Sequence, residues 1–267
     1  MTKSIDNAVQ ESSKIGVPQD SIWRILFMFL WPAVWYTVVI YGIVSLFVSE
    51  GEKVGSWTVQ LITVLATGAE LLVGLLLLRR EGHRRGDGAW RDRIRWHWPQ
   101  GRRAWILVIV VFVLAFALSQ LAPHLADVPG FVPPDWWPAG SDPRAEVNSA
   151  ADAYPDIELL GNFLFLFAAT SVTLIFNIFG EEIYYRGYLL PRMRGVFGRW
   201  DWVANGVLFT LKHAYQRWLY PGILVGGLAF AFAAGPLRSL PLAMIYHYVG
   251  AELFGTIFLI LETLGLG

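Results

Sequence analysis

The feature that most constrains this chain is a series of long apolar runs that carry almost no charge. With 55% hydrophobic residues over 267 positions, the composition excludes an ordinary soluble domain. Several runs reach the roughly 20 residues that a helix needs to cross a hydrocarbon layer, and they lack the strict alternation of barrel strands. The sequence therefore predicts an all-α, polytopic transmembrane helical bundle of about seven helices, or eight if the last run breaks near Gly250. The runs are residues 22–48, 57–78, 104–122, 159–180, 202–218, 221–234 and 239–264.

Charge is distributed unevenly over the connections between these runs. Residues 79–103 carry nine arginines, whereas residues 123–158 carry seven acidic residues and the single basic residue Arg144. By the positive-inside rule, the first connection is cytoplasmic and the second faces outward, which also places the N-terminus in the cytoplasm. We expect a multi-pass protein of the plasma membrane, which is the inner membrane in a bacterium. Its expected parts are a cytoplasmic tail at 1–21, accessory helices with both loops at 22–158, and a functional core at 159–264.

Five ionisable residues lie at membrane depth in the predicted core, namely Glu181, Glu182, Arg186, His213 and His247. Charged groups at that depth cost roughly 2.5–3.5 kcal/mol each on insertion scales, so a chain that keeps them uses them. With the helical rise of 1.5 Å per residue, Glu182 and both histidines lie about 14–16 Å from the cytoplasmic ends of their segments. The sequence therefore predicts one polar site in a single layer inside the bundle. Outside the core, only Arg24 and Glu70 are ionisable residues at membrane depth.

Helical phase separates the two adjacent glutamates. Glu182 and Arg186 are four residues apart and share a helix face, which predicts an ion pair. Glu181 is turned by about 100° from Glu182 and is expected to lack this partner, which suits a general base. A helix-packing ion pair is the alternative interpretation of these residues. Lys212, beside His213, is expected to reach the interface or to be paired.

Three spaced motifs carry a resemblance to a known family. They are Glu181-Glu182-x-x-x-Arg186, Phe209-x-x-x-His213 and the later His247. Over roughly residues 160–252 the chain resembles the CAAX-protease and bacteriocin-processing (CPBP) intramembrane endopeptidases, which places the protease core in 159–264. The resemblance implies that Glu181 activates water and that His213 and His247 complete the site. It further implies that Glu182 and Arg186 form a supporting pair and that Phe209 packs beside His213.

One position departs from the family pattern. The last motif of the family is usually His-x-x-x-Asn, whereas here Ala251 stands at the asparagine position. That asparagine is thought to stabilise the tetrahedral oxyanion, and loss of one such donor typically costs about 10²–10³ in rate. Glu252 could donate only if protonated. Asn177 lies four residues before Glu181 on nearly the same face, and it could compensate or simply bond a neighbouring helix.

The cofactor and the function class stay open on the sequence alone. Glu181, His213 and His247 are a plausible set of ligands for Zn²⁺, but the compact His-Glu-x-x-His signature is absent. The expected partners are a peptide or protein substrate in the membrane and the lipid bilayer, not nucleic acid. Ala251 favours an alternative, a catalytically impaired family member that acts as a scaffold or immunity protein. A proton-coupled transporter is a further alternative, and the absence of a visible internal repeat counts against it.

Overall fold

The computed structural model describes residues 17–48, 53–85, 90–119, 132–138 and 146–267. Within these ranges the chain is helical and contains no strand. Five stretches are long and apolar enough to cross a membrane: Ile22–Leu46, Ser56–Gly82, Phe163–Arg192, Ala214–Ala234 and Leu240–Thr263. The predicted all-α transmembrane bundle is confirmed. The tail predicted at 1–21 lies for the most part outside the described residues.

The helices follow the predicted runs with short irregular turns between or within them. They are α2 (Ile22–Thr37), α3 (Ser56–Arg85), α4 (Trp90–Arg93), α5 (Arg102–Ser119), α6 (Ala150–Ala153), α7 (Phe163–Val172), α8 (Arg194–Phe197), α9 (Asp201–Lys212), α10 (Tyr220–Ala234), α11 (Leu240–His247) and α12 (Leu253–Thr263). Short polar side chains begin several of them. Ser21 caps α2, Asn162 caps α7 and Ser239 caps α11, each by accepting a hydrogen bond from a backbone N–H of the first turn.

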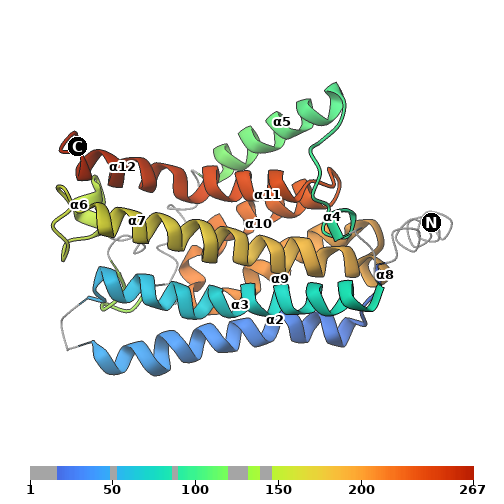
Figure 1. Ribbon diagram of the computed structural model, residues 1–267, viewed down its shortest axis with the longest axis horizontal. Helices are drawn as coiled ribbons and strands as arrows, with labels where there is room; N and C mark the ends of the chain where they lie inside the picture. The colour runs from blue at the N-terminus through green and yellow to red at the C-terminus, as the bar shows by residue number, and fades with distance from the viewer. Residues whose placement is uncertain (1–16, 49–52, 86–89, 120–131, 139–145) are drawn as a thin grey trace.

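The long helices lie roughly parallel in one bundle (Figure 1), in which α3 packs between α2 and the helix that begins with α7. α4 and α8 lie at one end of the bundle, and α6 lies at the other end with the C-terminus. The described parts of the basic 79–103 and acidic 123–158 connections are therefore at opposite ends. The start of α2 is at the basic end, since the N–H of Asp20 donates to the carbonyl of Arg192.

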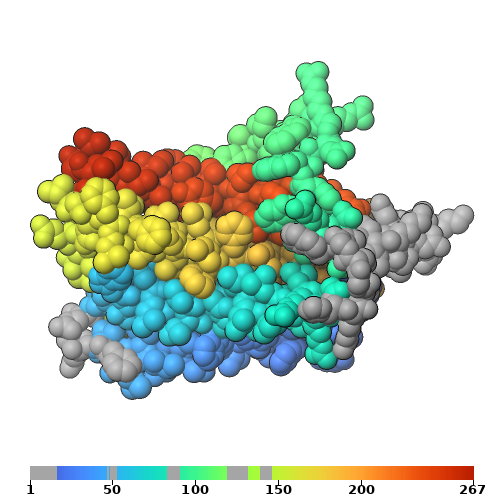
Figure 2. Space-filling view, viewed as in Figure 1, coloured from blue at the N-terminus to red at the C-terminus, as the bar shows by residue number. Residues whose placement is uncertain are grey.

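α5 stands apart from the other helices and contacts the bundle mainly through α10 (Figure 2). Its inner side packs Val108 among buried residues of α10 and α11, and the hydroxyl of Tyr246 donates to the carbonyl of Val108. Its outer side exposes large apolar side chains such as Ile109 and Val113. Because exposed apolar surface of this extent is rare in a soluble protein, the outer side of α5 suits contact with lipid.

The helix that carries the two glutamates is one continuous stretch, Phe163–Arg192. It passes from α7 through two π-helical segments, η5 (Thr173–Phe179) and η6 (Glu182–Leu189), which are unusual and often occur at functional sites. Gly180 lies between these two segments, where the helix passes close to α3: a Cβ atom at this position would lie 3.1 Å from the carbonyl oxygen of Thr67. The apolar run predicted at 159–180 thus extends to Arg192, and Glu181 and Glu182 lie inside the span.

The segment predicted as one helix at 202–218 ends earlier. α9 stops at Lys212, His213 caps it, and a 3₁₀ segment, η9 (Ala214–Leu219), follows with non-helical backbone at Gln216 (φ −136°, ψ 51°). α9 has 12 residues, which corresponds to about 18 Å and is shorter than the hydrocarbon layer. Lys212 and His213 therefore stand at a helix end within the bundle.

α9 and α10 form the most extensive pair of neighbouring elements in the fold. Their backbones touch at two glycines, because a Cβ atom at Gly206 would lie 3.0 Å from the Cα of Leu228, and one at Gly227 would lie 3.2 Å from the carbonyl oxygen of Gly206. The last predicted run, 239–264, forms a single span, Leu240–Thr263, which agrees with the prediction of one helix and not with the alternative of two. A π-helical segment, η10 (Tyr248–Glu252), interrupts it around Gly250, where the alternative had placed a break.

Candidate active site

Glu182 and Arg186 form the predicted ion pair one turn apart on the same helix. Both side chains are fully buried, and Nη1 of Arg186 lies 3.2 Å from Oε1 of Glu182. The guanidinium also lies over the ring of Phe209 at 3.9 Å and donates from Nη2 to the carbonyl of Gly227 at 3.4 Å. The pair thus joins the glutamate helix to α9 and α10, and cation–π contact adds to the attraction.

His247 is held against the same carboxylate. Its Nδ1 lies 3.1 Å from Oε1 of Glu182, and its ring stacks on Phe230 with centroids 4.6 Å apart. Because the Arg186-paired carboxylate is an acceptor, we assign a proton to Nδ1. Nε2 of the same ring lies 4.0 Å from Oε2 of Glu181.

His213 approaches Glu181 from the end of α9 in the same manner. Its Nδ1 lies 2.7 Å from the carbonyl oxygen of Phe209, which can only accept, so Nδ1 carries the proton. Its Nε2 lies 3.7 Å from Oε1 of Glu181. The ring of Phe209 packs edge-on against the His213 ring at 4.7 Å, so the expectation that Phe209 packs beside His213 is confirmed. Both histidines therefore present Nε2 to one carboxylate.

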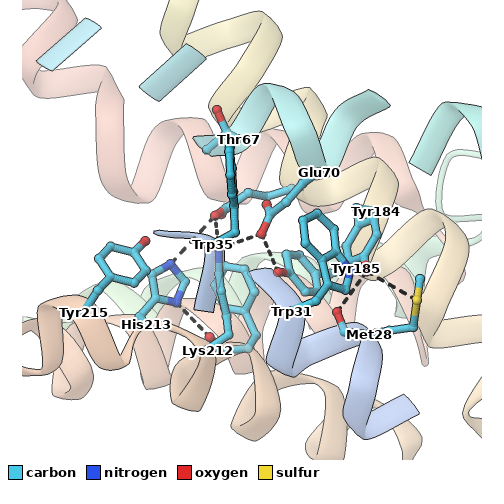
Figure 3. A network of polar contacts seen from close by, with 12 residues as sticks. Met28, Trp31, Trp35, Thr67, Glu70, Tyr184, Tyr185, Lys212, His213 and Tyr215 are labelled. Carbon is cyan, nitrogen blue, oxygen red and sulfur yellow. Dashed lines mark hydrogen bonds and ion pairs between the residues drawn. The ribbon is translucent and has the colours of Figure 1, made fainter. Parts of the chain in front are cut away.

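Glu181 has a cationic partner, which corrects the expectation that it would lack one. Nζ of Lys212 lies 2.5 Å from Oε1 of Glu181 and 3.3 Å from Oε1 of Glu70, and the Lys212 side chain is fully buried (Figure 3). Helical phase within the Glu181 segment could not reveal this partner. It comes from the last turn of α9, where the early end of that helix directs both Lys212 and His213 at Glu181.

Glu70 of α3 is the site residue that the sequence interpretation missed. It is fully buried, and the hydroxyl of Tyr185 donates to its Oε1 at 2.6 Å. Three buried carboxylates, from Glu70, Glu181 and Glu182, thus lie beside the two cations Lys212 and Arg186. The available signal was its depth in the apolar run 57–78, where it is the only ionisable residue.

A cavity of about 450 Å³ opens at the two histidines and Glu181. Apolar residues of α5 and α10, among them Phe112, Phe116, Ile223 and Val225, form much of its wall. Asn177, Ala251 and Glu252 line it as well, and Nδ2 of Asn177 donates to Oε1 of Glu252 at 3.0 Å. Asn177 is therefore at the cavity, with one of its two N–H groups already engaged by Glu252.

Comparison with known proteins identifies the segment that contains these residues. Residues 162–250 match the family model described as type II CAAX prenyl endopeptidase Rce1-like. The chain carries an Rce1-like domain. This agrees with the resemblance to the CPBP family, and it supports a multi-pass membrane endopeptidase at the level of the family. No curated protein and no solved structure matches the chain.

The Rce1-like domain contains Glu181, Glu182, Arg186, Phe209, His213 and His247, all of which the fold brings together. It also contains Lys212, whereas Glu70 belongs to the part of the chain that precedes the match. Asn177 is within the domain and reaches the cavity. Its side-chain amide donates a hydrogen bond to Glu252 and not to Glu181.

The residues proposed as zinc ligands do not assemble a metal site. Among the described residues, no group of three histidine, aspartate or glutamate side chains is placed to hold a metal ion. Zinc ligands lie about 2.0–2.2 Å from the ion, and Oε1 of Glu181 is instead occupied by the ammonium of Lys212 at 2.5 Å.

Proposed function

We propose that this protein is an intramembrane endopeptidase that hydrolyses a peptide bond of a membrane-associated or lipidated substrate, with Glu181 as the general base. The observation that carries the proposal is the convergence of two Nε2 atoms, of His213 and His247, on the Glu181 carboxylate at the wall of an apolar cavity. The carboxylate of Glu181 and the Nε2 lone pair of His213 can accept the two O–H groups of a single water molecule, which suits its binding and activation.

In the first step, Glu181 takes a proton from this water, and the water oxygen attacks the carbonyl carbon of the scissile bond. The carbonyl electrons move onto oxygen, which gives a tetrahedral oxyanion. In the second step the intermediate collapses, the C–N bond breaks, and the proton held by Glu181 passes to the leaving nitrogen. His213 orients the water by accepting a hydrogen bond from its other O–H group at Nε2, since Nδ1 of His213 is fixed on the carbonyl of Phe209.

His247 is proposed to stabilise the oxyanion. Its Nε2 must then carry a proton while Nδ1 donates to Glu182, so the step requires the doubly protonated ring beside two carboxylates. Ala251 offers no donor at the usual asparagine position. We propose that the free N–H of Asn177, at the wall of the same cavity, takes over part of this role.

The substrate is proposed to enter from the cytoplasmic side of the plasma membrane, with the N-terminus of the protein on that side. The chain has no cysteine, so single cysteines at the exposed positions Arg102 and Glu158 would report the orientation directly. An impermeant maleimide applied to intact cells should label Glu158→Cys and leave Arg102→Cys unlabelled. The opposite labelling pattern would overturn the assigned orientation.

The test of the function compares peptide termini in membranes and medium of cells that carry wild type or Glu181→Gln at matched expression. Glu158→Gln is the matched control, because it makes the same exchange at an exposed position in the outer connection. We expect termini that are present in wild type and Glu158→Gln and absent in Glu181→Gln. Those termini would also identify the substrate.

A non-catalytic scaffold or immunity protein is the second candidate, and Ala251 is the observation that favours it. It predicts identical termini in wild type and Glu181→Gln under conditions in which the gene is needed. It also predicts that Glu181→Gln supports the cellular role of the protein. Either result would exclude the proposed peptidase and favour the scaffold.

A further inference from the structure

Lys212 and Glu70 form a buried ion pair. Lys212 also contacts the carboxylate of Glu181, and of these three residues only Glu181 lines the cavity. We propose that Lys212 and Glu70 are positioning residues, in which Lys212 holds Glu181 ionised and correctly oriented and Glu70 holds Lys212. The inference rests on the proposed function, because it assigns Lys212 a role only if Glu181 acts on a substrate.

The surroundings of Lys212 show that its ammonium lies in the interior of the bundle and not at the membrane interface. A lysine near a helix end in a membrane protein commonly extends toward the interface, where its ammonium is hydrated. Here the ammonium points inward and lies within 4.5–5.2 Å of the ring centres of Tyr36, Tyr185 and Phe209. Within the part of the chain that the structure describes, its ammonium donates hydrogen bonds to Glu181 and Glu70 alone. Both bonds are made to carboxylates. Hydrogen bonds between charged groups are stronger than neutral ones, so the two together fix the position of Nζ.

Glu70 is the second carboxylate that contacts the ammonium of Lys212. Its Oε1 accepts from the Tyr185 hydroxyl at 2.6 Å and from Nζ of Lys212 at 3.3 Å, and both residues are fully buried. Glu70 and Lys212 do not line the cavity, whereas Glu181 does. Neither residue of the pair is therefore placed to touch substrate, and any effect on the reaction must pass through Glu181.

Lys212 acts on the protonation state of Glu181 before and after the proton transfer. A neighbouring ammonium stabilises the ionised form of a carboxylate, so Glu181 is charged when the water arrives. The same attraction favours return of the proton from Glu181 to the leaving nitrogen in the second step. The short contact to Oε1 also fixes the rotation of the carboxylate, so that Oε2 faces His247.

The alternative is that Lys212 merely neutralises Glu70, and charge-matched variants separate the two roles. Lys212→Met leaves Glu70 buried without its cation, so we expect loss of both stability and activity. The double variant Lys212→Met/Glu70→Gln removes the charge of Glu70 as well and should recover part of the lost melting temperature of the purified protein in detergent, since Glu181 still lacks its cation. Glu70→Gln alone measures how much Glu70 contributes to holding Lys212, and Glu158→Gln, at an exposed position outside the site, is the control for unchanged activity.

Activity is measured on the peptide whose terminus depends on Glu181 in the cell comparison. We expect kcat of Lys212→Met/Glu70→Gln to stay about 10²-fold below wild type, the size of effect that a misplaced catalytic group produces. KM should change by less than about twofold, since neither residue touches the cavity, and Glu70→Gln alone should lower kcat by less than the double variant does, because Lys212 still contacts Glu181.

The outcomes are distinguishable. A double variant that regains both stability and wild-type kcat would overturn the inference and leave the peptidase intact, because Lys212 would then serve only to neutralise Glu70. A loss of activity expressed in KM alone would also overturn it. If wild type itself yields no Glu181-dependent terminus, the proposed function fails, and the inference fails with it.

Discussion

Substituting alanine for Gly206 tests whether the close approach of α9 and α10 sets the geometry of the site. A Cβ atom at this position would lie 2.9 Å from Cδ2 of Leu228 and 3.0 Å from both the Cα and the backbone nitrogen of that residue. Two of these three atoms belong to backbone and cannot rotate away. Since carbon atoms prefer separations of about 3.5–4.0 Å, the two helices must move apart by about 0.5–1 Å.

The displacement has a modest effect on stability and a large one on activity. Overpacking typically costs about 1–3 kcal/mol, and the better helix propensity of alanine returns about 1 kcal/mol, so the net loss is up to about 2 kcal/mol. The site is more sensitive, because Lys212 and His213 end α9 and the carbonyl of Gly227 on α10 accepts from Arg186. A misplacement of about 1 Å can cost about 10²-fold in rate.

The assay measures the rate of Glu181-dependent cleavage and the melting temperature of Gly206→Ala in detergent. Gly255→Ala on α12 is the matched control, because a Cβ atom there would meet nothing within 4 Å. We expect the control to cleave at the wild-type rate and Gly206→Ala to be slower by about 10²-fold. Cleavage by Gly206→Ala within twofold of the control would refute the argument that this contact sets the site geometry.

Three further outcomes follow from the site. Arg186→Met leaves Glu182 buried without its cation and should lower the free energy of unfolding by about 3–5 kcal/mol in denaturation measurements. Adding Glu182→Gln should recover part of that loss, and no recovery would contradict the pairing. Asn177→Ala should abolish cleavage if its amide replaces the missing donor at Ala251, and wild-type turnover in that variant would remove Asn177 from the mechanism. Treatment with a metal chelator should leave the cleavage rate unchanged, because Lys212 and not a metal ion neutralises Glu181; a loss that added Zn²⁺ reverses would refute the metal-free mechanism.

Features that depend on local periodicity were predicted well from the sequence. The bundle follows from the length of the apolar runs, and the Glu182–Arg186 pair follows from a spacing of one helical turn. The common depth of Glu182, His213 and His247 followed from counting residues inward from charged segment ends. That reasoning placed the three side chains in one layer of the bundle. In the structure, Nδ1 of His247 is within hydrogen-bond distance of Glu182, as expected for side chains at the same depth.

Features that depend on which helices pack together were not predicted. Lys212 and Glu70 are 142 positions apart, and no periodicity in either segment relates them. The end of α9 was misjudged for a different reason. The polar residues at 212–217 were included in the apolar run predicted at 202–218, whereas the backbone turns into a 3₁₀ segment after Lys212.

The Glu70–Lys212 contact makes the catalytic segment dependent on a helix that the family match does not include. A graft of residues 162–250 into another bundle would keep the contact of Lys212 with Glu181 but lose the one with Glu70, which is one of the two hydrogen bonds that place the ammonium. Exchange of the accessory helices between relatives would meet the same obstacle. We therefore expect positions 70 and 212 to change together as these proteins diverge, so that a neutral residue at one is accompanied by a neutral residue at the other.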